Sequence, residues 1–162
     1  MYVVQPPNRA PATQSMQIFL AGSIEQGKAE DWQQKFIHSL NGVNCSIYNP
    51  RRLDWNPDWT QSPENLEFSK QVSWEMDRIT EADLIVFYFQ PGTFSPISVG
   101  EFYYAAALGK PIMVCCPEGF WRKGNIDVVS LRHLNVRSYS TLDELIKAVK
   151  LVVINAPGYY NT

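Results

Sequence analysis

The hydrophobic positions along the chain form short continuous runs that alternate with stretches of helical spacing. The run Leu84–Phe89 has six apolar or aromatic residues, which is too short for a typical helix and too continuous for a half-solvated strand. Strands of this kind are buried on both faces, as in parallel sheets. Similar runs predict further strands at 16–20, 44–48 and 112–116, and a short last strand around Val136.

Apolar residues at helical spacing lie between these runs. They predict helices over 28–40, 63–80 and 98–108, and a final helix that Thr141 and Glu144 open as a capping box. The expected inward stripe of the helix over 63–80 is Phe68, Val72, Met76 and Ile79. This order of elements predicts a flavodoxin/Rossmann-like doubly wound α/β sheet of about five mostly parallel strands, with helices on both faces.

Length and composition indicate one domain. With 162 residues, of which 45% are hydrophobic, the chain can bury one sizeable core. The prolines within residues 1–15 predict an extended N-terminal arm that could lie along another subunit. We therefore expect a single α/β domain over 16–154, preceded by this arm and followed by a C-terminal tail over 155–162.

Charge and hydropathy narrow the choice of partners. A formal net charge of −2 provides no basic field, which argues against nucleic acid and anionic membrane surfaces and favours a small-molecule site. The first residues lack the apolar core of a signal peptide, and no run approaches the roughly 18 apolar residues of a membrane span. These features predict a cytoplasmic protein.

The cysteines and histidines do not form a ligand pattern. Cys45, Cys115 and Cys116 fall on predicted buried strands, and His38 and His133 lie far apart in the sequence. None of these residues has the spacing of metal ligands. We expect core thiols, no metal site and no cofactor.

Glu101 is the carboxylate nearest the predicted switch from strand to helix after Phe89. In a βαβ unit, a ligand binds at the carboxyl end of the strand, where the loop meets the helix. Two interpretations are open. Ser98 and Glu101 have the spacing of a capping box; alternatively, Gly100 lets a ligand approach the backbone, and the helix dipole keeps Glu101 ionised as a nucleophile.

Three other segments carry candidate chemistry. The Gly22-Ser23 turn is a second strand-to-helix junction at the same edge of the sheet. Glu75 lies on or beside an apolar stripe, where a carboxylate needs a partner unless it turns out to solvent. The loop after the third strand combines arginines with Asp54 and Trp55, which could frame an aromatic ring and its polar edge.

These segments together resemble the nucleoside 2-deoxyribosyltransferase family over about residues 16–154. The resemblance is carried by Ile18–Ser23, by Glu75 before Ala82-Asp83, and by Ser95–Glu101. It implies that Glu101 is the nucleophile that attacks the anomeric carbon of a 2′-deoxynucleoside and holds a covalent deoxyribosyl intermediate, with net retention. It also implies that Glu75 binds the base and delivers its proton.

The same resemblance assigns the remaining substrate contacts and partners. The residues that match substrate-binding positions are Gly22, Ser23, Asn49, Asp54, Trp55, Ser95, Gly100 and Asn125. The expected substrates are 2′-deoxynucleosides and free nucleobases. A homo-oligomer is implied, in which the Gly124-Asn125 segment and the aromatic tail reach a neighbouring subunit's site.

Several positions depart from the family pattern. Ser95 replaces an aspartate that is typical of the transferases, whereas the related 2′-deoxynucleoside 5′-monophosphate N-hydrolases have serine there. Those hydrolases follow their Gly-Ser-Ile turn with an arginine that holds phosphate, but this chain has Glu25, which favours an unphosphorylated nucleoside. The family's first-strand tyrosine is Ile18 or Phe19 here, so Tyr103 or Tyr104 are the candidates to bond the nucleophile.

The expected activity is therefore nucleoside 2-deoxyribosyl transfer. The alternatives are an N-glycosidase acting on a 2′-deoxynucleoside or its 5′-monophosphate, and a non-catalytic nucleoside-binding module on the same fold. Transferase and glycosidase share the covalent intermediate and differ in whether water reaches it. A Glu101 bonded only to the Ser98 amide would favour the binding module.

Overall fold

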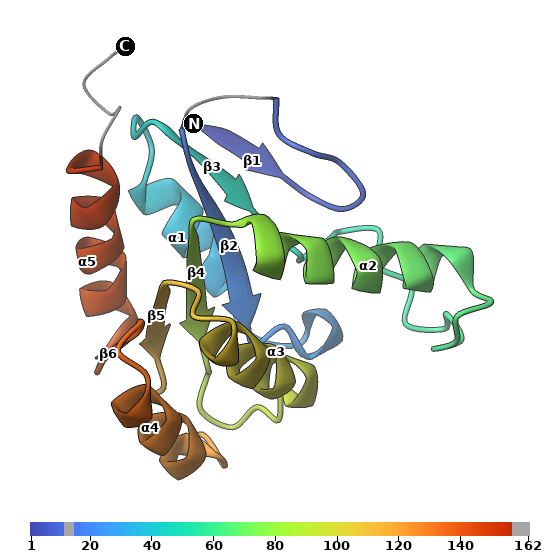
Figure 1. The fold of residues 1–162 in the computed structure, drawn as a ribbon. Coiled ribbons are helices and arrows are strands. Elements are labelled where there is room, and N and C mark those ends of the chain that lie inside the picture. The colour runs from blue at the N-terminus through green and yellow to red at the C-terminus, as the bar shows by residue number, and fades with distance from the viewer. Residues whose placement is uncertain (12–14, 157–162) are drawn as a thin grey trace.

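A parallel sheet lies at the centre of the molecule, and helices pack on both of its faces (Figure 1). The computed structural model describes residues 1–11 and 15–156, apart from the side chain of Gln26. The strands are β1 (Tyr2–Val4), β2 (Met16–Gly22), β3 (Cys45–Tyr48), β4 (Leu84–Tyr88), β5 (Ile112–Cys115) and β6 (Val136–Tyr139). The helices are α1 (Trp32–Ser39), α2 (Leu66–Glu81), α3 (Pro96–Ala107), α4 (Lys123–Arg132) and α5 (Leu142–Ile154), with a 3₁₀ turn η1 (Glu25–Gly27).

The strand order defines where a ligand can bind. The sheet runs β1-β3-β2-β4-β5-β6, and each neighbouring pair is parallel. After β2 the chain continues through α1 to β3 on one side, whereas after β4 it continues through α3 to β5 on the other. The switch point is therefore between the carboxyl ends of β2 and β4, which confirms the predicted doubly wound fold. In such a fold a ligand is expected at this edge of the sheet.

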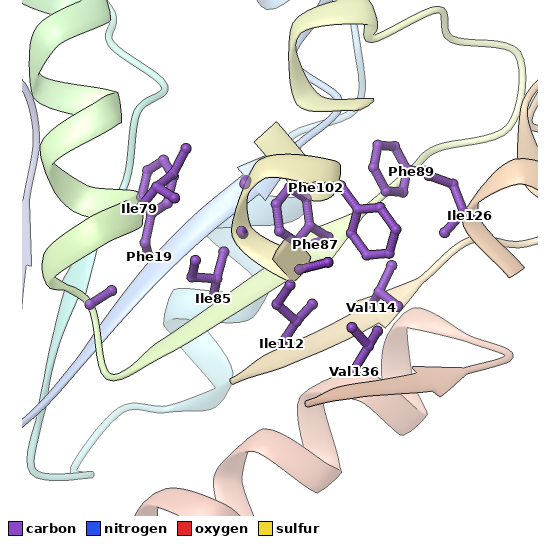
Figure 2. Close-up of a cluster of buried hydrophobic side chains, with 14 of the residues drawn as sticks. Phe19, Ile79, Ile85, Phe87, Phe89, Phe102, Ile112, Val114, Ile126 and Val136 are labelled. Carbon is purple, nitrogen blue, oxygen red and sulfur yellow. The ribbon is translucent and has the colours of Figure 1, made fainter. Parts of the chain in front are cut away.

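Two hydrophobic cores hold the helices to the sheet. One core lies under α1 and α5 and includes Trp32 and Leu145. The other lies under α2, α3 and α4, where Phe87 of β4 meets Phe102 of α3 with ring centroids 5.3 Å apart (Figure 2). Because Phe102 is fully buried, the neighbouring residue Glu101 is held at a fixed position beside the sheet.

The sheet has one strand more than expected. Residues 2–4, expected within an extended arm, form β1 and pair in parallel with β3. The residues that follow lie against α2 of the same chain, because Trp74 Nε1 donates to Asn8 O at 2.7 Å and Arg9 pairs with Asp77 at 3.1 Å. The end of the expected tail, 157–162, lies outside the described residues.

Helix α2 is rotated relative to the expected stripe. Val72 and Met76, expected to face inward, are exposed, and the buried residues include Gln71, Trp74 and Arg78. Trp74 packs edge-on against Phe19 and Tyr48, and the Arg78 guanidinium lies over the Tyr48 ring at 4.7 Å. Burial of these large rings sets the rotation and turns Gln71 and Glu75 toward the interior.

Helices α3 and α4 begin at residues that the sequence pattern did not indicate. Helix α3 begins at Pro96, with Ser95 as its N-cap residue. Proline suits the first helical position, because the missing N–H would have no partner there. Helix α4 is not among the predicted helices, and the Gly124-Asn125 segment lies in its first turn.

Candidate functional site

The end of β2 lies unusually close to β4. A Cβ on Gly22, which has φ +128°, would lie 2.1 Å from Tyr88 O, so no side chain fits there. The next amide, Ser23 N, donates to Tyr88 O at 2.9 Å. Glycine is therefore required at 22 to bring the turn after β2 against β4, which places Ser23 at the switch point.

Ser23 is fully buried within a cluster of hydroxyl groups. Its Oγ lies 2.7 Å from Thr93 Oγ1 and 2.9 Å from Ser95 Oγ, and it accepts from Gln90 N at 2.8 Å. This cluster ties the β2 turn to the loop between β4 and α3. Ser23 and Ser95, both expected in the site, are thus brought together across 72 residues of sequence.

The carboxylate of Glu25 binds the backbone just before α3. One of its oxygens accepts from Phe94 N at 3.0 Å, from Ser95 N at 2.7 Å and from Ser95 Oγ at 3.2 Å. Ser95 has a left-handed backbone, with φ +43°, and its side chain does not cap the helix. Glu25 therefore supplies the anion that the N-terminal end of α3 attracts.

Glu101 lies in the second turn of α3, so the expected capping box with Ser98 is wrong. Ser98 is a residue of the first helical turn and not the N-cap, and its hydroxyl donates to Gly22 O at 2.9 Å. The expectation that the helix dipole keeps Glu101 ionised is also wrong, because no acidic residue lies in the first turn. The cause of both differences is Pro96, which starts the helix before Ser98.

The two candidate catalytic carboxyls lie on helices α2 and α3 and are close enough for the charge of Glu75 to act on Glu101. Burial raises the pKa of Glu101, and the negative charge of Glu75 raises it further, while the Ser98 hydroxyl acts in the opposite direction. Burial likewise raises the pKa of Glu75, and a hydrogen bond from Gln71 opposes the increase. Raised pKa values in two neighbouring carboxyls allow one of them to be protonated while the other is ionised, which is the combination that acid and nucleophile chemistry needs.

Gln71 holds Glu75 in place from the preceding turn of α2. Its Nε2 donates to Glu75 Oε1 at 2.8 Å and to Pro50 O at 3.2 Å. The spacing of four residues between Gln71 and Glu75 is visible in the sequence, but the misplaced stripe of α2 concealed that both face inward. Glu25, Thr93 and Ser98 also make contacts at this edge that no pattern in the sequence indicates.

The three predicted site residues of the loop after β3 differ in burial and in their contacts. Asn49 is buried, and its Oδ1 accepts from Arg51 N at 3.0 Å, so it shapes the turn. Asp54 is exposed and pairs with Arg52, which lowers the pKa of its carboxyl. Trp55 is half-buried, stacks edge-on with Trp59, and its buried Nε1 has no hydrogen-bond partner among the described residues.

The remaining expected residues have few contacts within this chain. Gly100 faces open space, since a Cβ there would meet no atom within 4 Å. Asn125 is exposed in α4, where its backbone amide donates to Arg122 O at 2.9 Å. Tyr103 and Tyr104, the candidates to bond Glu101, are both exposed on α3.

A separate cavity of about 250 Å³ lies at the carboxyl ends of β5 and β6. Lys123 lines it and pairs there with Asp127 at 2.7 Å. Neither Glu75 nor Glu101 lines this cavity, so it is distinct from the carboxyl pair. Within 1–11 and 15–156, no group of three or more acidic, histidine or cysteine side chains could hold a metal ion.

Cys45, Cys115 and Cys116 are buried free thiols, and burial raises the pKa of each. They belong to the core, as the sequence indicates. Over the part of the chain that the structure describes, no helix has the length and apolar character to cross a membrane.

The fold and this edge define a doubly wound α/β protein with a carboxyl pair at its switch point. The sequence profile described as nucleoside 2-deoxyribosyltransferase like matches residues 15–120, and the chain belongs to that family. By its description, this family is related to enzymes that transfer the 2-deoxyribosyl group of nucleosides.

Solved structures share the fold. A conserved protein from Enterococcus faecalis V583 is similar with a TM-score of 0.58 and 12% identity, over 85% of this chain and 98% of that one. The CMP N-glycosidase BcmB from Clostridium botulinum has a TM-score of 0.52 and 23% identity, over 83% of this chain and 98% of its own. No curated protein sequence matches the chain.

Proposed function

We propose that the protein is a nucleoside 2-deoxyribosyltransferase that moves 2-deoxyribose between nucleobases. The observation that carries the proposal is that Glu75 and Glu101, on helices α2 and α3, are both partly buried and interact electrostatically, and that the pKa of each is raised. Two such carboxyls can provide one nucleophile and one acid at the same time. The absence of a capping box at Glu101 removes the structural role that competed with catalysis.

The first step requires an ionised Glu101 and a protonated Glu75. Because burial and Glu75 raise the pKa of Glu101 to about 8, above the value of about 7 for Glu75, the proton passes from Glu101 to Glu75 before the reaction. A Glu101 carboxylate oxygen forms a bond to C1′ of the nucleoside as the bond from C1′ to the base nitrogen breaks. The electron pair leaves with the base, which takes the proton of Glu75. The products are a free neutral base and a deoxyribosyl ester on Glu101.

In the second step, an incoming base attacks C1′ with a ring nitrogen. The C1′–O bond to Glu101 breaks, its electron pair returns to the carboxylate, and the N–H proton of the incoming base passes to Glu75. Each step inverts C1′, so the new nucleoside retains the configuration of the first. The N-glycosidase differs only in that water takes the place of the second base.

Glu25 supports an unphosphorylated substrate. Its carboxylate occupies the two amides before α3, at 3.0 and 2.7 Å, which are the groups at this edge best suited to bind an anion. A 5′-phosphate would have to displace this carboxylate and accept a like charge nearby. We expect the 5′-monophosphate to react more slowly than the nucleoside by about tenfold or more, and Glu25→Gln to narrow that difference.

The second candidate is an N-glycosidase. Ser95 favours it, because the aspartate typical of the transferases is missing at this position. The structural neighbour that is a CMP N-glycosidase is 23% identical and supports the fold alone. The acceptor base is therefore the deciding variable in the assay.

The experiment follows the products of deoxythymidine or deoxyinosine by chromatography, with and without free adenine. Deoxyadenosine that appears only with adenine, and is lost in Glu101→Gln, supports the transferase. A matched control is Glu67→Gln, an exposed glutamate of α2 that pairs with Lys70; it should leave turnover unchanged. Free base released without an acceptor would support the glycosidase, and no turnover of either nucleoside or monophosphate would leave a binding module.

The outer face of α3 supports the expected homo-oligomer. Ile97, Tyr104 and Leu108 recur at helical spacing and are exposed at 71%, 39% and 47%, and helix α3 has no charged side chain other than Glu101. An apolar face of this kind is typical of an interface. Light scattering after gel filtration should give a mass above 18.5 kDa, and Leu108→Glu should reduce it.

A further inference from the structure

Gln71 has an amide oxygen that no group in the chain satisfies. The side chain is 4% exposed, and Oε1 is buried without a hydrogen-bond partner among the described residues. Buried amide oxygens in proteins are nearly always bonded, so one that is not calls for an explanation. This one lies on the same side chain that holds Glu75.

The orientation of the amide is fixed by chemistry. Nε2 donates to Pro50 O at 3.2 Å and to Glu75 Oε1 at 2.8 Å. The Pro50 carbonyl oxygen can only accept, so the NH₂ group must face it. Glu75 Oε1 accepts from the same group, which leaves the other carboxyl oxygen of Glu75 free to carry the proton. The remaining atom, Oε1, is therefore committed as an acceptor and cannot be exchanged for a donor by rotation of the amide.

Glu75 and Gln71 together therefore offer complementary groups. Protonated Glu75 donates, and Gln71 Oε1 accepts. A 6-aminopurine carries the matching pair side by side, because its N7 accepts and its 6-amino group donates, whereas a 6-oxopurine presents two acceptors there. In a 4-aminopyrimidine, ring N3 and the amino group provide the same pair.

We propose that Gln71 is a specificity-determining residue whose Oε1 accepts a hydrogen bond from the exocyclic amino group of the nucleobase. The proposal rests on the proposed function, since it places the base beside Glu75. It selects amino bases over oxo bases, because an oxo group would set one acceptor against another. Water does not reach Oε1 in the structure, so the base displaces the side chains that now cover it.

The test compares deoxyadenosine with deoxyinosine, which differ at position 6. Binding is measured by calorimetry in a Glu101→Gln background, where turnover does not interfere. We expect deoxyadenosine to bind about tenfold more tightly or better. In the Glu101→Gln, Gln71→Leu double variant the ratio should fall toward one, chiefly through weaker deoxyadenosine binding.

Gln33 provides the matched control. It is also a fully buried glutamine, but its Oε1 accepts from Arg51 Nη1 at 3.4 Å and its Nε2 donates to Ser23 O at 3.5 Å. Gln33→Leu should leave the ratio of the two affinities unchanged. If Gln71→Leu does not fold, the preference of the protein with Gln71 intact still tests the proposal.

The outcomes separate the two proposals. Equal affinities for the two nucleosides, an unchanged ratio after Gln71→Leu, or binding of neither nucleoside would each overturn the role of Gln71. Deoxyribosyl transfer by the unsubstituted protein at equal rates with adenine and hypoxanthine as acceptors would overturn it too, while leaving the transferase intact. Preferential binding of deoxyadenosine by a protein that turns over no substrate would support the proposed role of Gln71 and contradict the proposed enzymatic function.

Discussion

The N-terminal ends of α3 and α5 carry the same sequence pattern and are built differently. At α5, Thr141 Oγ1 accepts from Glu144 N at 3.2 Å, and the Glu144 carboxylate accepts from Thr141 N at 3.2 Å. At α3, Ser98 and Glu101 have this spacing but lie inside the helix, and Glu25 binds the amides before it. At α5 the local cap occupies the side chains of both Thr141 and Glu144. At α3 the cap comes from a residue 70 positions away, so the side chains of Ser98 and Glu101 are available for other contacts.

The largest difference between the two ends should appear in turnover. Glu101→Gln removes the proposed nucleophile and should lower the rate of deoxyribosyl transfer by at least about a thousandfold. Glu144→Gln, at the matching position of α5, should change the rate less than about twofold. Initial rates with deoxyinosine and adenine measure both, and similar losses in the two variants would show that Glu101 acts through helix stability alone.

The distant cap at α3 should matter for stability. Glu25→Ala leaves two amides without their acceptor and should lower the free energy of unfolding by about 1–3 kcal/mol. Urea denaturation measures the loss. Glu118, an exposed glutamate that lies 3.9 Å from Lys123, gives the control Glu118→Ala, which should cost less than about 0.5 kcal/mol; equal losses would mean that Glu25 does not cap α3.

Because of the carboxyl pair, the free energy of unfolding should fall as pH rises. The exposed Glu144 of the α5 cap should not cause such a decrease. Burial and Glu75 raise the pKa of Glu101 to about 8. Because its pKa is higher folded than unfolded, the folded state binds the proton more tightly, and stability falls as pH rises from about 4.5 toward 8. Glu101→Gln should therefore raise the free energy of unfolding by roughly 1–2 kcal/mol at pH 8 and by much less at pH 4.5.

Melting temperatures across this pH range test the sign. The benefit of Glu101→Gln should grow with pH, and Glu144→Gln should give no such trend. A benefit that shrinks with rising pH would mean that Glu101 is stabilised as a carboxylate.

The smallest expected effect is at the local cap. Thr141→Ala should lower the free energy of unfolding by about 1 kcal/mol and leave turnover unchanged. Thr141→Ser keeps the hydroxyl and should recover most of the loss. A lower turnover rate in folded Thr141→Ala would contradict this prediction and show that α5 contributes to the site.

The sequence was sufficient for the doubly wound fold because its strands are continuous apolar runs. The same information placed Glu101 and Ser23 at one edge, since parallel strands end together, whereas Glu75 and Ser95 were assigned to the site by the family resemblance. It failed where tertiary packing decides. The rotation of α2 is set by Trp74 against Phe19 and Tyr48, which no periodicity of α2 alone can reveal.

The contacts of Glu25 could not be predicted from the sequence, for a related reason. Its partners, Phe94 N and Ser95 N, are backbone groups, so no side-chain pattern marks them. Their availability depends on the left-handed turn at Ser95 and on Pro96 as the first helical residue. The sequence showed that Glu25 replaces an arginine of related enzymes, but not that its carboxylate is bound by the chain itself.

The position of β1 has a practical consequence for handling the protein. Strand β1 covers the outer edge of β3, and residues 8 and 9 lie on α2 beside Trp74 and Asp77. Removal of residues 1–11 would expose the backbone of β3 as a template for intermolecular strand pairing. Shortened versions that begin at the family match are therefore expected to aggregate on expression, and affinity tags are better placed at the other end of the chain.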